Sequence, residues 1–121
     1  MDEPVHYLEN SDFDKDGNLI NPDIPKNLPV VIMLQANFCG YCTSAKSAFE
    51  EFAKENTDRV FAATIQGDGN VRDEAPLGKR LNTIKKKFRG FPDYVLYING
   101  KRVEKEIGGR SKVDLEKFTF N

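Results

Sequence analysis

The chain has 121 residues, of which 39% are hydrophobic and 31% are charged, and its formal net charge at pH 7 is −1. This length predicts a single domain over residues 1–121 that buries a core of its own. The near balance of charges argues against nucleic acid or an anionic membrane as the main partner, and no apolar run is long enough to cross a bilayer.

The sequence contains two cysteines and shows no signal peptide. Its first residues, from Met1 to His6, include neither a basic start nor an apolar stretch. We therefore expect a cytoplasmic protein, while removal of a leader would leave a periplasmic or secretory location open. A structural disulfide framework needs more cysteines, so one close pair indicates a redox-active or metal-binding site.

Residues 5–29 are polar and rich in turn-forming residues. A short strand is predicted at residues 6–8, and Asp16-Gly17 is predicted to close a hairpin. Three prolines between residues 22 and 29 indicate an irregular approach to the first central strand.

Four aspartates in this segment match the spacing of a calcium-binding loop. Carboxylates at alternate positions can converge on a hard cation while a glycine makes the turn. The missing flanking helices and an Asp in place of Glu at the twelfth position argue against calcium. An acidic hairpin turn is therefore the preferred interpretation, with calcium as the alternative. The four candidate ligands are Asp12, Asp14, Asp16 and Asp23.

Two apolar runs, at residues 30–36 and 60–65, are predicted as strands that are buried on both faces. Between them, apolar side chains recur with helical spacing and predict a helix that packs one stripe against the core. This stripe consists of Ala45, Ala48, Phe49, Phe52 and Ala53. The strand–helix–strand order predicts a right-handed unit with a parallel pair at the centre of the sheet.

A polar loop at residues 66–75 precedes a second predicted helix, which begins at Pro76 and ends at Gly90. Its apolar stripe consists of Leu77, Leu81, Ile84 and Phe88. The helix is also strongly basic, which indicates a solvated face or a docking surface for acidic partners or for the charge of glutathione. The basic residues are Lys79, Arg80, Lys85, Lys86, Lys87 and Arg89.

The last third is predicted as a hairpin followed by a helix. Residues 94–98 form the first strand, and Asn99-Gly100 is a two-residue turn into an antiparallel strand at 101–107. Gly108-Gly109 ends that strand. Ser111 with Asp114 three residues later resembles a capping box for a short helix at 112–118.

The motif Cys39-Gly40-Tyr41-Cys42 lies where the first central strand becomes a helix. The start of a helix supplies unpaired N–H groups and a partial positive charge, which stabilise a thiolate at Cys39. A thiolate attacks disulfides, and Cys42, one helical turn inward, can then displace the product. Zinc is the alternative, but it takes about four ligands, and this pair has only the distant His6 in addition. We therefore expect no bound metal.

Four segments in this order resemble the thioredoxin-fold superfamily, in which a CxxC motif lies near a strand–helix–strand unit. The resemblance implies an α/β thioredoxin fold: a central mixed β-sheet, built from a βαβ unit followed by a β-hairpin and a C-terminal helix, and flanked by helices. Residues 1–29 are a divergent N-terminal segment. The four segments are the strand with Ala36-Asn37-Phe38-Cys39-Gly40-Tyr41-Cys42, then Arg89-Gly90-Phe91-Pro92, the hairpin, and Ile107-Gly108-Gly109-Arg110-Ser111.

The resemblance also implies roles for individual residues. Cys39 is the expected nucleophile and Cys42 the resolving cysteine. Pro92 is expected to follow a cis peptide bond and to present the Phe91 backbone to an extended substrate. Further substrate contacts are expected from Phe38, Gly40 and Tyr41. Core packing is the alternative role for the two phenylalanines.

The chain departs from thioredoxins at two places. Met33 occupies the position where thioredoxins usually carry a buried Asp that handles the proton of the resolving cysteine. Another group or water would then have to take that proton. The Tyr41 before the second cysteine and the Gly108-Gly109 pair are similar to glutaredoxins, whereas the hairpin length is similar to thioredoxins.

These features predict a monomeric protein-disulfide oxidoreductase, most simply a reductase, whose redox-active group is its own disulfide. Protein disulfides are the expected substrates, and a thioredoxin reductase or a glutathione system is the expected electron donor. A glutathione-coupled enzyme, a disulfide oxidase or isomerase, and a redox-sensing or client-binding module remain as alternatives. The direction depends on the reduction potential, which spans about −270 to −120 mV in this fold family.

Overall fold

The computed structural model describes residues 1–37, 39–68 and 77–121, and it contains a five-stranded sheet in the order β1-β3-β2-β4-β5. The pairs β1–β3 and β3–β2 are parallel, while β2–β4 and β4–β5 are antiparallel. The strands are β1 (His6–Tyr7), β2 (Val30–Gln35), β3 (Phe61–Gln66), β4 (Asp93–Ile98) and β5 (Lys101–Val103). This mixed sheet confirms the expected fold class.

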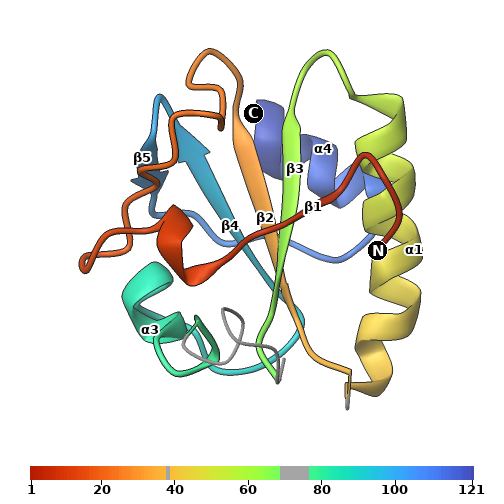
Figure 1. Cartoon of the computed structure of the whole chain (residues 1–121). Coiled ribbons are helices and arrows are strands. Elements are labelled where there is room, and N and C mark those ends of the chain that lie inside the picture. Colours follow the sequence, from red (N-terminus) through yellow and green to blue (C-terminus); the bar gives the residue numbers. More distant parts are fainter. Residues whose placement is uncertain (38, 69–76) are drawn as a thin grey trace.

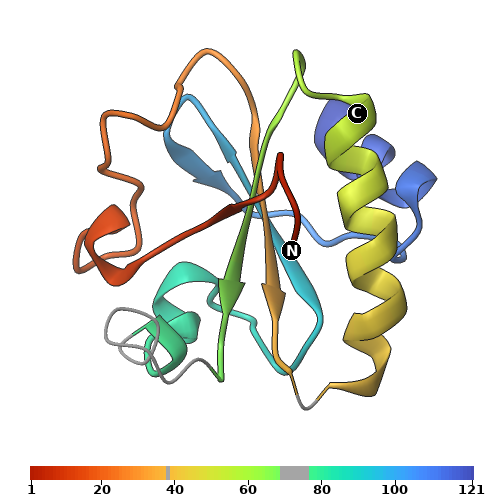
Figure 2. The ribbon, with the colours of Figure 1, turned by 45° about the vertical axis from the view of Figure 1, so that its right-hand side comes forward.

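Helices cover both faces of the sheet (Figures 1 and 2). Helices α1 (Gly40–Glu55) and α4 (Lys112–Phe120) lie together on one face. The short 3₁₀ helix η1 (Asn10–Asp12) and α3 (Leu81–Ile84) lie on the other. Both faces of the central strands are therefore shielded from water.

Strand β2 is the centre of the core, and all six of its residues are buried. Its side chains alternate between the two faces, as the two-residue period of a strand requires. Val31 and Met33 pack with the α1 side chains Phe49 and Phe52. The intervening residues pack on the opposite face with the N-terminal segment and α3; they are Val30, Ile32 and Leu34.

The divergent N-terminal segment is part of the core. The predicted first strand is confirmed as β1, which extends the sheet beside β3. Leu8, Phe13 and Leu19 are buried on the α3 face. The predicted turn is also confirmed, because Phe13 pairs with Leu19 across it and Gly17 has a φ of +84°.

Two aspartates of this segment form hydrogen bonds within the turn itself. Asp12 accepts hydrogen bonds from the Glu9 N–H and the Asn21 amide, at 2.7 Å each. Asp14 accepts bonds from the backbone of Asp16 and Asn18, at 2.9 Å each. Within the described ranges, no group of three or more His, Cys, Asp or Glu residues is arranged to hold a metal ion. The carboxylates of Asp12 and Asp14 therefore serve the turn itself, as the preferred interpretation of an acidic hairpin turn implies, and the calcium alternative for Asp12, Asp14, Asp16 and Asp23 stays a prediction.

The long basic helix expected from residue 76 to 90 is wrong. Pro76, with residues 69–75, lies outside the described residues, and α3 spans only Leu81–Ile84. After the last helical bond, from the Lys85 N–H to the Leu81 carbonyl at 2.8 Å, the backbone becomes extended at Lys85. The chain leaves the helix here because the Lys85 side chain turns into the protein and binds Asp93. The basic residues therefore do not share one helix face.

The hairpin and the C-terminal helix follow the prediction at their starts. Asn99 and Gly100 both have positive φ, of 54° and 80°, which is the conformation of a two-residue hairpin turn. The returning strand is shorter than expected, because β5 pairs only over Lys101–Val103 and Glu106 then turns toward Lys85. The capping box is confirmed: the Ser111 hydroxyl accepts from the Asp114 N–H at 3.1 Å.

The helices in the described part of the chain are too short or too polar to cross a membrane.

Gly17 is held where a side chain does not fit, so we expect Gly17→Ala to lower the free energy of unfolding by about 2 kcal/mol or more. Its φ is +84°, and an added Cβ would lie 2.5 Å from the Thr83 carbonyl oxygen. Urea unfolding measures the effect. Gly90→Ala is the control: nothing lies within 4 Å of its added Cβ, so it should change stability by less than about 0.5 kcal/mol. Equal stability of the two variants would contradict this account of the turn.

Candidate functional site

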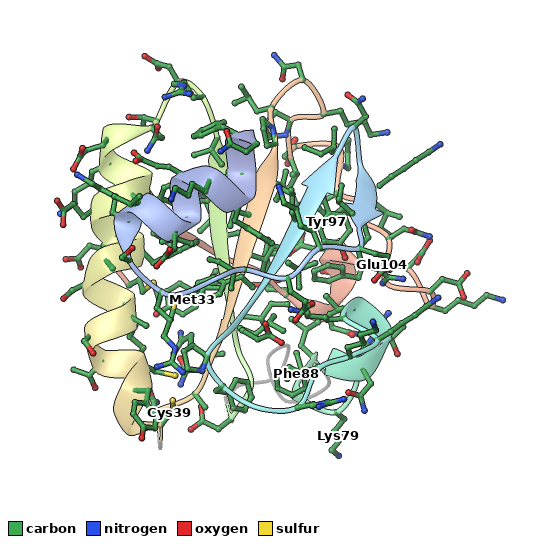
Figure 3. The ribbon with its side chains drawn as sticks, turned by 180° about the vertical axis from the view of Figure 1, so that it is seen from behind. Met33, Cys39, Lys79, Phe88, Tyr97 and Glu104 are labelled. Atoms are coloured by element: carbon green, nitrogen blue, oxygen red, sulfur yellow. The ribbon has the colours of Figure 1, made fainter. Side chains whose placement is uncertain are left out.

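The cysteine pair lies at the N-terminus of α1, directly after the central strand. The Cys39 N–H donates to the Ala36 carbonyl at 3.3 Å, and the Cys42 N–H donates to the Cys39 carbonyl at 3.2 Å. Cys39 is the N-cap residue of α1, with extended backbone and no side-chain cap bond. Figure 3 shows Cys39 at this end of the helix and Met33 in the layer between the sheet and α1. The Cys39 sulfur therefore lies at the positive end of the α1 dipole.

The two thiols differ in access to solvent. Both are free, but Cys39 is half-buried and Cys42 is fully buried. Burial raises the pKa of the Cys42 thiol to about 11, and its hydrogen bond with Cys39 adds to the rise. A reagent or a substrate can therefore reach Cys39 first, while Cys42 stays protonated inside the protein.

The predicted cis peptide bond is confirmed between Phe91 and Pro92. The Cys39 thiol lies 3.5 Å from the Phe91 carbonyl oxygen, as donor to acceptor. Because β2 and β4 are antiparallel, the end of β2 lies beside the start of β4, which brings Cys39 and Pro92 together across 53 residues of sequence. The structure thus brings together Cys39, Cys42 and Pro92, the three residues to which the sequence analysis gives the main roles in thiol–disulfide exchange.

The Phe91 ring packs inward rather than toward the cysteines. It contacts the Phe88 ring edge-on, with centroids 5.1 Å apart, and lies so close to Gly67 that an added Cβ would be 2.3 Å from it. The part of Phe91 that faces Cys39 is its carbonyl group. Core packing, the alternative weighed for this ring, describes its contacts. Phe38 lies outside the described residues.

The surface next to Cys39 is formed by Gly40, Tyr41 and Arg110. Gly40 is exposed, and Tyr41 is exposed over 70% of its area. The Arg110 guanidinium lies over the Tyr41 ring, 5.1 Å from its centroid, in a cation–π arrangement. Arg110 also borders a depression of about 260 Å³ that begins at Pro92. Its other lining residues are Asp93, Tyr94, Glu106, Ile107, Gly108 and Gly109.

The buried Lys85 joins the two sides of this depression, although the sequence predicted it on a basic helix face. Lys85 is only 5% exposed. Its ammonium donates to Asp93 at 2.6 Å and to the Tyr94 carbonyl at 3.0 Å, and lies 3.0 Å from the Glu106 carboxylate. Asp93 directly follows Pro92, and Glu106 directly precedes Ile107. The ion cluster of Lys85, Asp93 and Glu106 therefore fixes the spacing of the two chain segments that line the depression.

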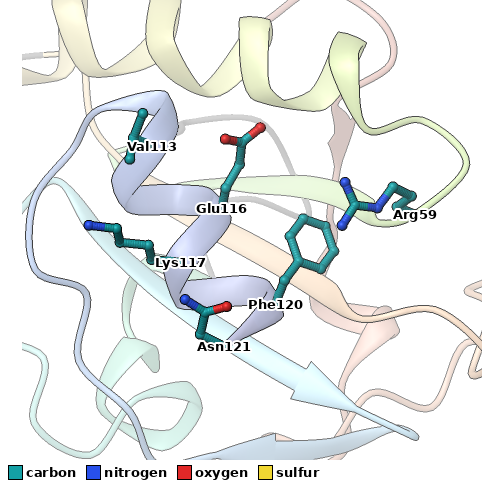
Figure 4. Close-up of a pocket in the computed structure, with 6 residues that line it drawn as sticks. All are labelled: Arg59, Val113, Glu116, Lys117, Phe120 and Asn121. Atoms are coloured by element: carbon teal, nitrogen blue, oxygen red, sulfur yellow. The ribbon is translucent and has the colours of Figure 1, made fainter.

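Another surface hollow lies far from the cysteines. It is bordered by Arg59, Val113, Glu116, Lys117, Phe120 and Asn121 (Figure 4). Arg59 faces the Phe120 ring there, 4.0 Å from its centroid. This hollow is at the far end of α1, whose 16 residues span about 24 Å, so it takes no part in thiol chemistry.

Removal of the buried ammonium should destabilise the protein. We expect Lys85→Met to lower the free energy of unfolding by about 3 kcal/mol, because it leaves the Asp93 carboxylate without its partner. Urea unfolding measures the loss. Lys86→Met is the matched control, since Lys86 is exposed, and it should stay within about 0.5 kcal/mol of the parent. A Lys85→Met variant as stable as the control would show that the cluster does not hold this region together.

The two cysteines should differ strongly toward an alkylating reagent. With a pKa of about 11, only about one Cys42 side chain in ten thousand is a thiolate at pH 7, and it is also buried. Iodoacetamide added to the reduced native protein should therefore modify Cys39 first and Cys42 only after unfolding in urea. Peptide mass spectrometry gives the order. Equal modification of both cysteines in the native state would contradict the assigned burial.

Comparison with known proteins agrees with this geometry. The family model for thioredoxin matches residues 5–120. Thioredoxin-like protein 453L of Invertebrate iridescent virus 6 is 46% identical over 115 residues, which cover 86% of this chain and 83% of the relative. Thioredoxin from Acidithiobacillus ferridurans is 25% identical over 118 residues, covering 98% and 95% of the two chains.

Among solved structures, a thioredoxin from Malassezia sympodialis (Mala s 13) superposes with a TM-score of 0.64 at 20% identity, over 93% of this chain and 85% of the other. That likeness supports the fold. The family model, which covers nearly the whole sequence, and the relative that is 46% identical show that the chain belongs to the thioredoxin family.

Proposed function

We propose that this protein is a thiol–disulfide oxidoreductase that reduces disulfides of other proteins. The observation that carries the proposal is the position of the half-buried Cys39 sulfur, at a helix N-terminus and 3.5 Å from the carbonyl that precedes Pro92. A backbone segment of a substrate can lie along that carbonyl while its disulfide meets Cys39. Cys42 lies behind Cys39 as a buried, protonated thiol.

The first step is attack by the Cys39 thiolate on one sulfur of the substrate disulfide. A bond forms between Cys39 and that sulfur, and the electron pair of the broken disulfide leaves with the other substrate sulfur, which takes up a proton. The helix N-terminus stabilises negative charge on Cys39 before the attack.

The second step releases the substrate. Cys42 loses its proton and attacks the Cys39 sulfur, so that a bond forms between the two cysteines of the protein. The electron pair of the mixed disulfide leaves with the second substrate sulfur, which is then protonated. The substrate disulfide has gained two electrons and two protons, and the Cys39–Cys42 dithiol has lost them. A donor must then reduce the pair again.

The direction of transfer is proposed from the relatives, several of which are named thioredoxin. Thioredoxin has a potential of about −270 mV and acts as a reductant in a reducing compartment. We accordingly propose the cytoplasm as the location, a thioredoxin reductase as the donor, and a monomer as the working form.

A glutathione-coupled reaction is a second candidate. The observation that favours it is the depression in which Gly108, Gly109 and Arg110 lie beside Pro92, since a small peptide with carboxylates needs backbone donors and a cation. The Asp114 carboxylate lies close to Gly109, where an added Cβ would be 2.2 Å from it, and it would repel such an anion. Thioredoxin reductase with NADPH and glutathione with its reductase, tested side by side, distinguish the two donors.

Insulin reduction tests the proposal. With dithiothreitol as the donor, wild type should accelerate the precipitation of insulin chains, and Cys39→Ser should be no faster than dithiothreitol alone, because the nucleophile is gone. Cys42→Ser should accumulate a mixed disulfide with its protein substrates, since the second step is blocked, and mass spectrometry detects the adduct. Trapped partners combined with no turnover by wild type would instead support a client-binding module and contradict the proposed enzyme.

A further inference from the structure

The interior next to the cysteines contains polar groups without partners. Within the described part of the chain, three buried side-chain nitrogen or oxygen atoms lack a hydrogen bond: Nε2 and Oε1 of Gln35 and the hydroxyl oxygen of Tyr94. Gln35 is 0% exposed and Tyr94 is 1% exposed. Native proteins contain few such groups, and each one calls for an explanation because it lowers stability.

Both side chains lie on the α1 face of the sheet. Gln35 is the last residue of β2 and, by strand alternation, faces the same side as Val31 and Met33, which pack against α1. Tyr94 pairs with Met33 across the β2–β4 ladder and packs near the α1 ring of Phe49, with centroids 6.1 Å apart. All three unpartnered atoms therefore belong to the layer beneath the active-site helix.

Cys42 faces the same layer. Its sulfur interacts with the backbone N–H of Ala36, the residue that follows Gln35. Burial raises the pKa of Tyr94, the Arg110 cation opposes that rise, and the charges of Cys42 and Cys39 add to it, so the phenol remains a neutral hydrogen-bond donor. Gln35 likewise carries an N–H₂ donor that does not titrate.

Among the described residues, the charged and titratable groups that act on Cys42 or Tyr94 supply no base. From α1 and its cap they are Cys39 and Lys46, of which Lys46 favours the thiolate. From β4 they are Tyr94 and the adjoining Asp93, and Arg110 acts on Tyr94 from the segment before α4. Asp93 is already paired with Lys85. On β2, Met33 also faces this layer, and its thioether cannot take a proton.

We propose that Gln35 and Tyr94 form an uncharged hydrogen-bonding site behind Cys42 that stabilises its sulfur while it loses its proton in the resolving step. This inference rests on the proposed function and names the residues that serve its second step. Both are positioning residues: they donate hydrogen bonds toward the developing thiolate, while the departing substrate thiolate is the final acceptor of the proton.

The proton and electron balance of the step is complete without a carboxylate. Cys42 gives up its proton, its sulfur forms a bond with Cys39, and the bond between Cys39 and the substrate breaks. The substrate sulfur leaves with the electron pair and receives the proton. Two neutral donors lower the cost of placing negative charge on a buried sulfur, as hydrogen bonds to the charged form do elsewhere.

The test measures the Cys42 thiol alone, in a Cys39→Ser background, by thiolate absorbance against pH. Tyr94→Phe and Gln35→Met keep the shape of each side chain but remove the donor. Each should raise the pKa of Cys42 by about one unit, the value of one hydrogen bond to a charged group. In the protein with both cysteines, single-turnover release of the mixed disulfide should slow about tenfold at pH 7.

Tyr97→Phe is the matched control. Tyr97 is also a buried tyrosine of β4, but it belongs to the opposite core cluster and its hydroxyl donates to the Gly17 carbonyl at 2.6 Å. It should leave the pKa of Cys42 and the release rate unchanged. Tyr94→Phe should moreover resist urea at least as well as the parent, since it removes an unpaired buried hydroxyl, whereas Tyr97→Phe should lose stability.

A Cys42 pKa within about 0.2 units of the parent in both folded variants would overturn the proposal. A rise in either variant, with none in Tyr97→Phe, supports it. Because the titration needs neither a substrate nor a donor, its outcome is independent of whether wild type reduces insulin. Failure of the proposed function and failure of this inference are therefore distinguishable.

Discussion

The site depends on the pairing of β2 with a neighbour on each edge. The parallel bond network with β3 fixes the strand–helix–strand unit, so α1 must begin where β2 ends. Strand β4 is antiparallel to β2, so the end of β2 lies beside the start of β4. This arrangement places the N-terminus of α1, Cys39 and the Phe91–Pro92 bond at the same end of the central strands. Any shift in the β2–β4 register would separate the Cys39 sulfur from the Phe91 carbonyl.

Burial gives the two cysteines different chemistry. Cys39 caps α1 and reaches the surface, whereas Cys42 lies inside, where the low dielectric opposes its ionisation. This difference in burial protects the Cys42 thiol until a mixed disulfide forms at Cys39. It also slows the attack of Cys42 on that mixed disulfide unless groups inside the protein stabilise the Cys42 thiolate. In this chain a methionine stands where a carboxylate is usual in the family. The unpaired Gln35 and Tyr94 groups lie on that same face and provide the polarity that Met33 lacks.

Predictions from the sequence were correct where a local residue pattern allowed only one structural interpretation. The almost entirely apolar β2, the stripe of α1, the Asn99-Gly100 turn and the CxxC motif all lie where they were expected. The predictions failed where a distant partner decided the outcome. Lys85 reads as part of a basic helix, but its contact with Asp93 ends α3, and its contact with Glu106 draws the chain away from β5. The roles inferred for Gln35 and Tyr94 likewise depend on which strands lie side by side, which no residue pattern within one strand contains.

The reduction potential of the Cys39–Cys42 pair tests the central claim most directly. Equilibration of the protein with defined ratios of oxidised and reduced dithiothreitol, followed by acid quenching and counting of thiols, gives the value. A reductase of the kind proposed should lie near about −270 mV, where thioredoxin lies. A value near about −120 mV, typical of a strong disulfide oxidant, would contradict the account, and so would a pair of thiols that forms no disulfide at all.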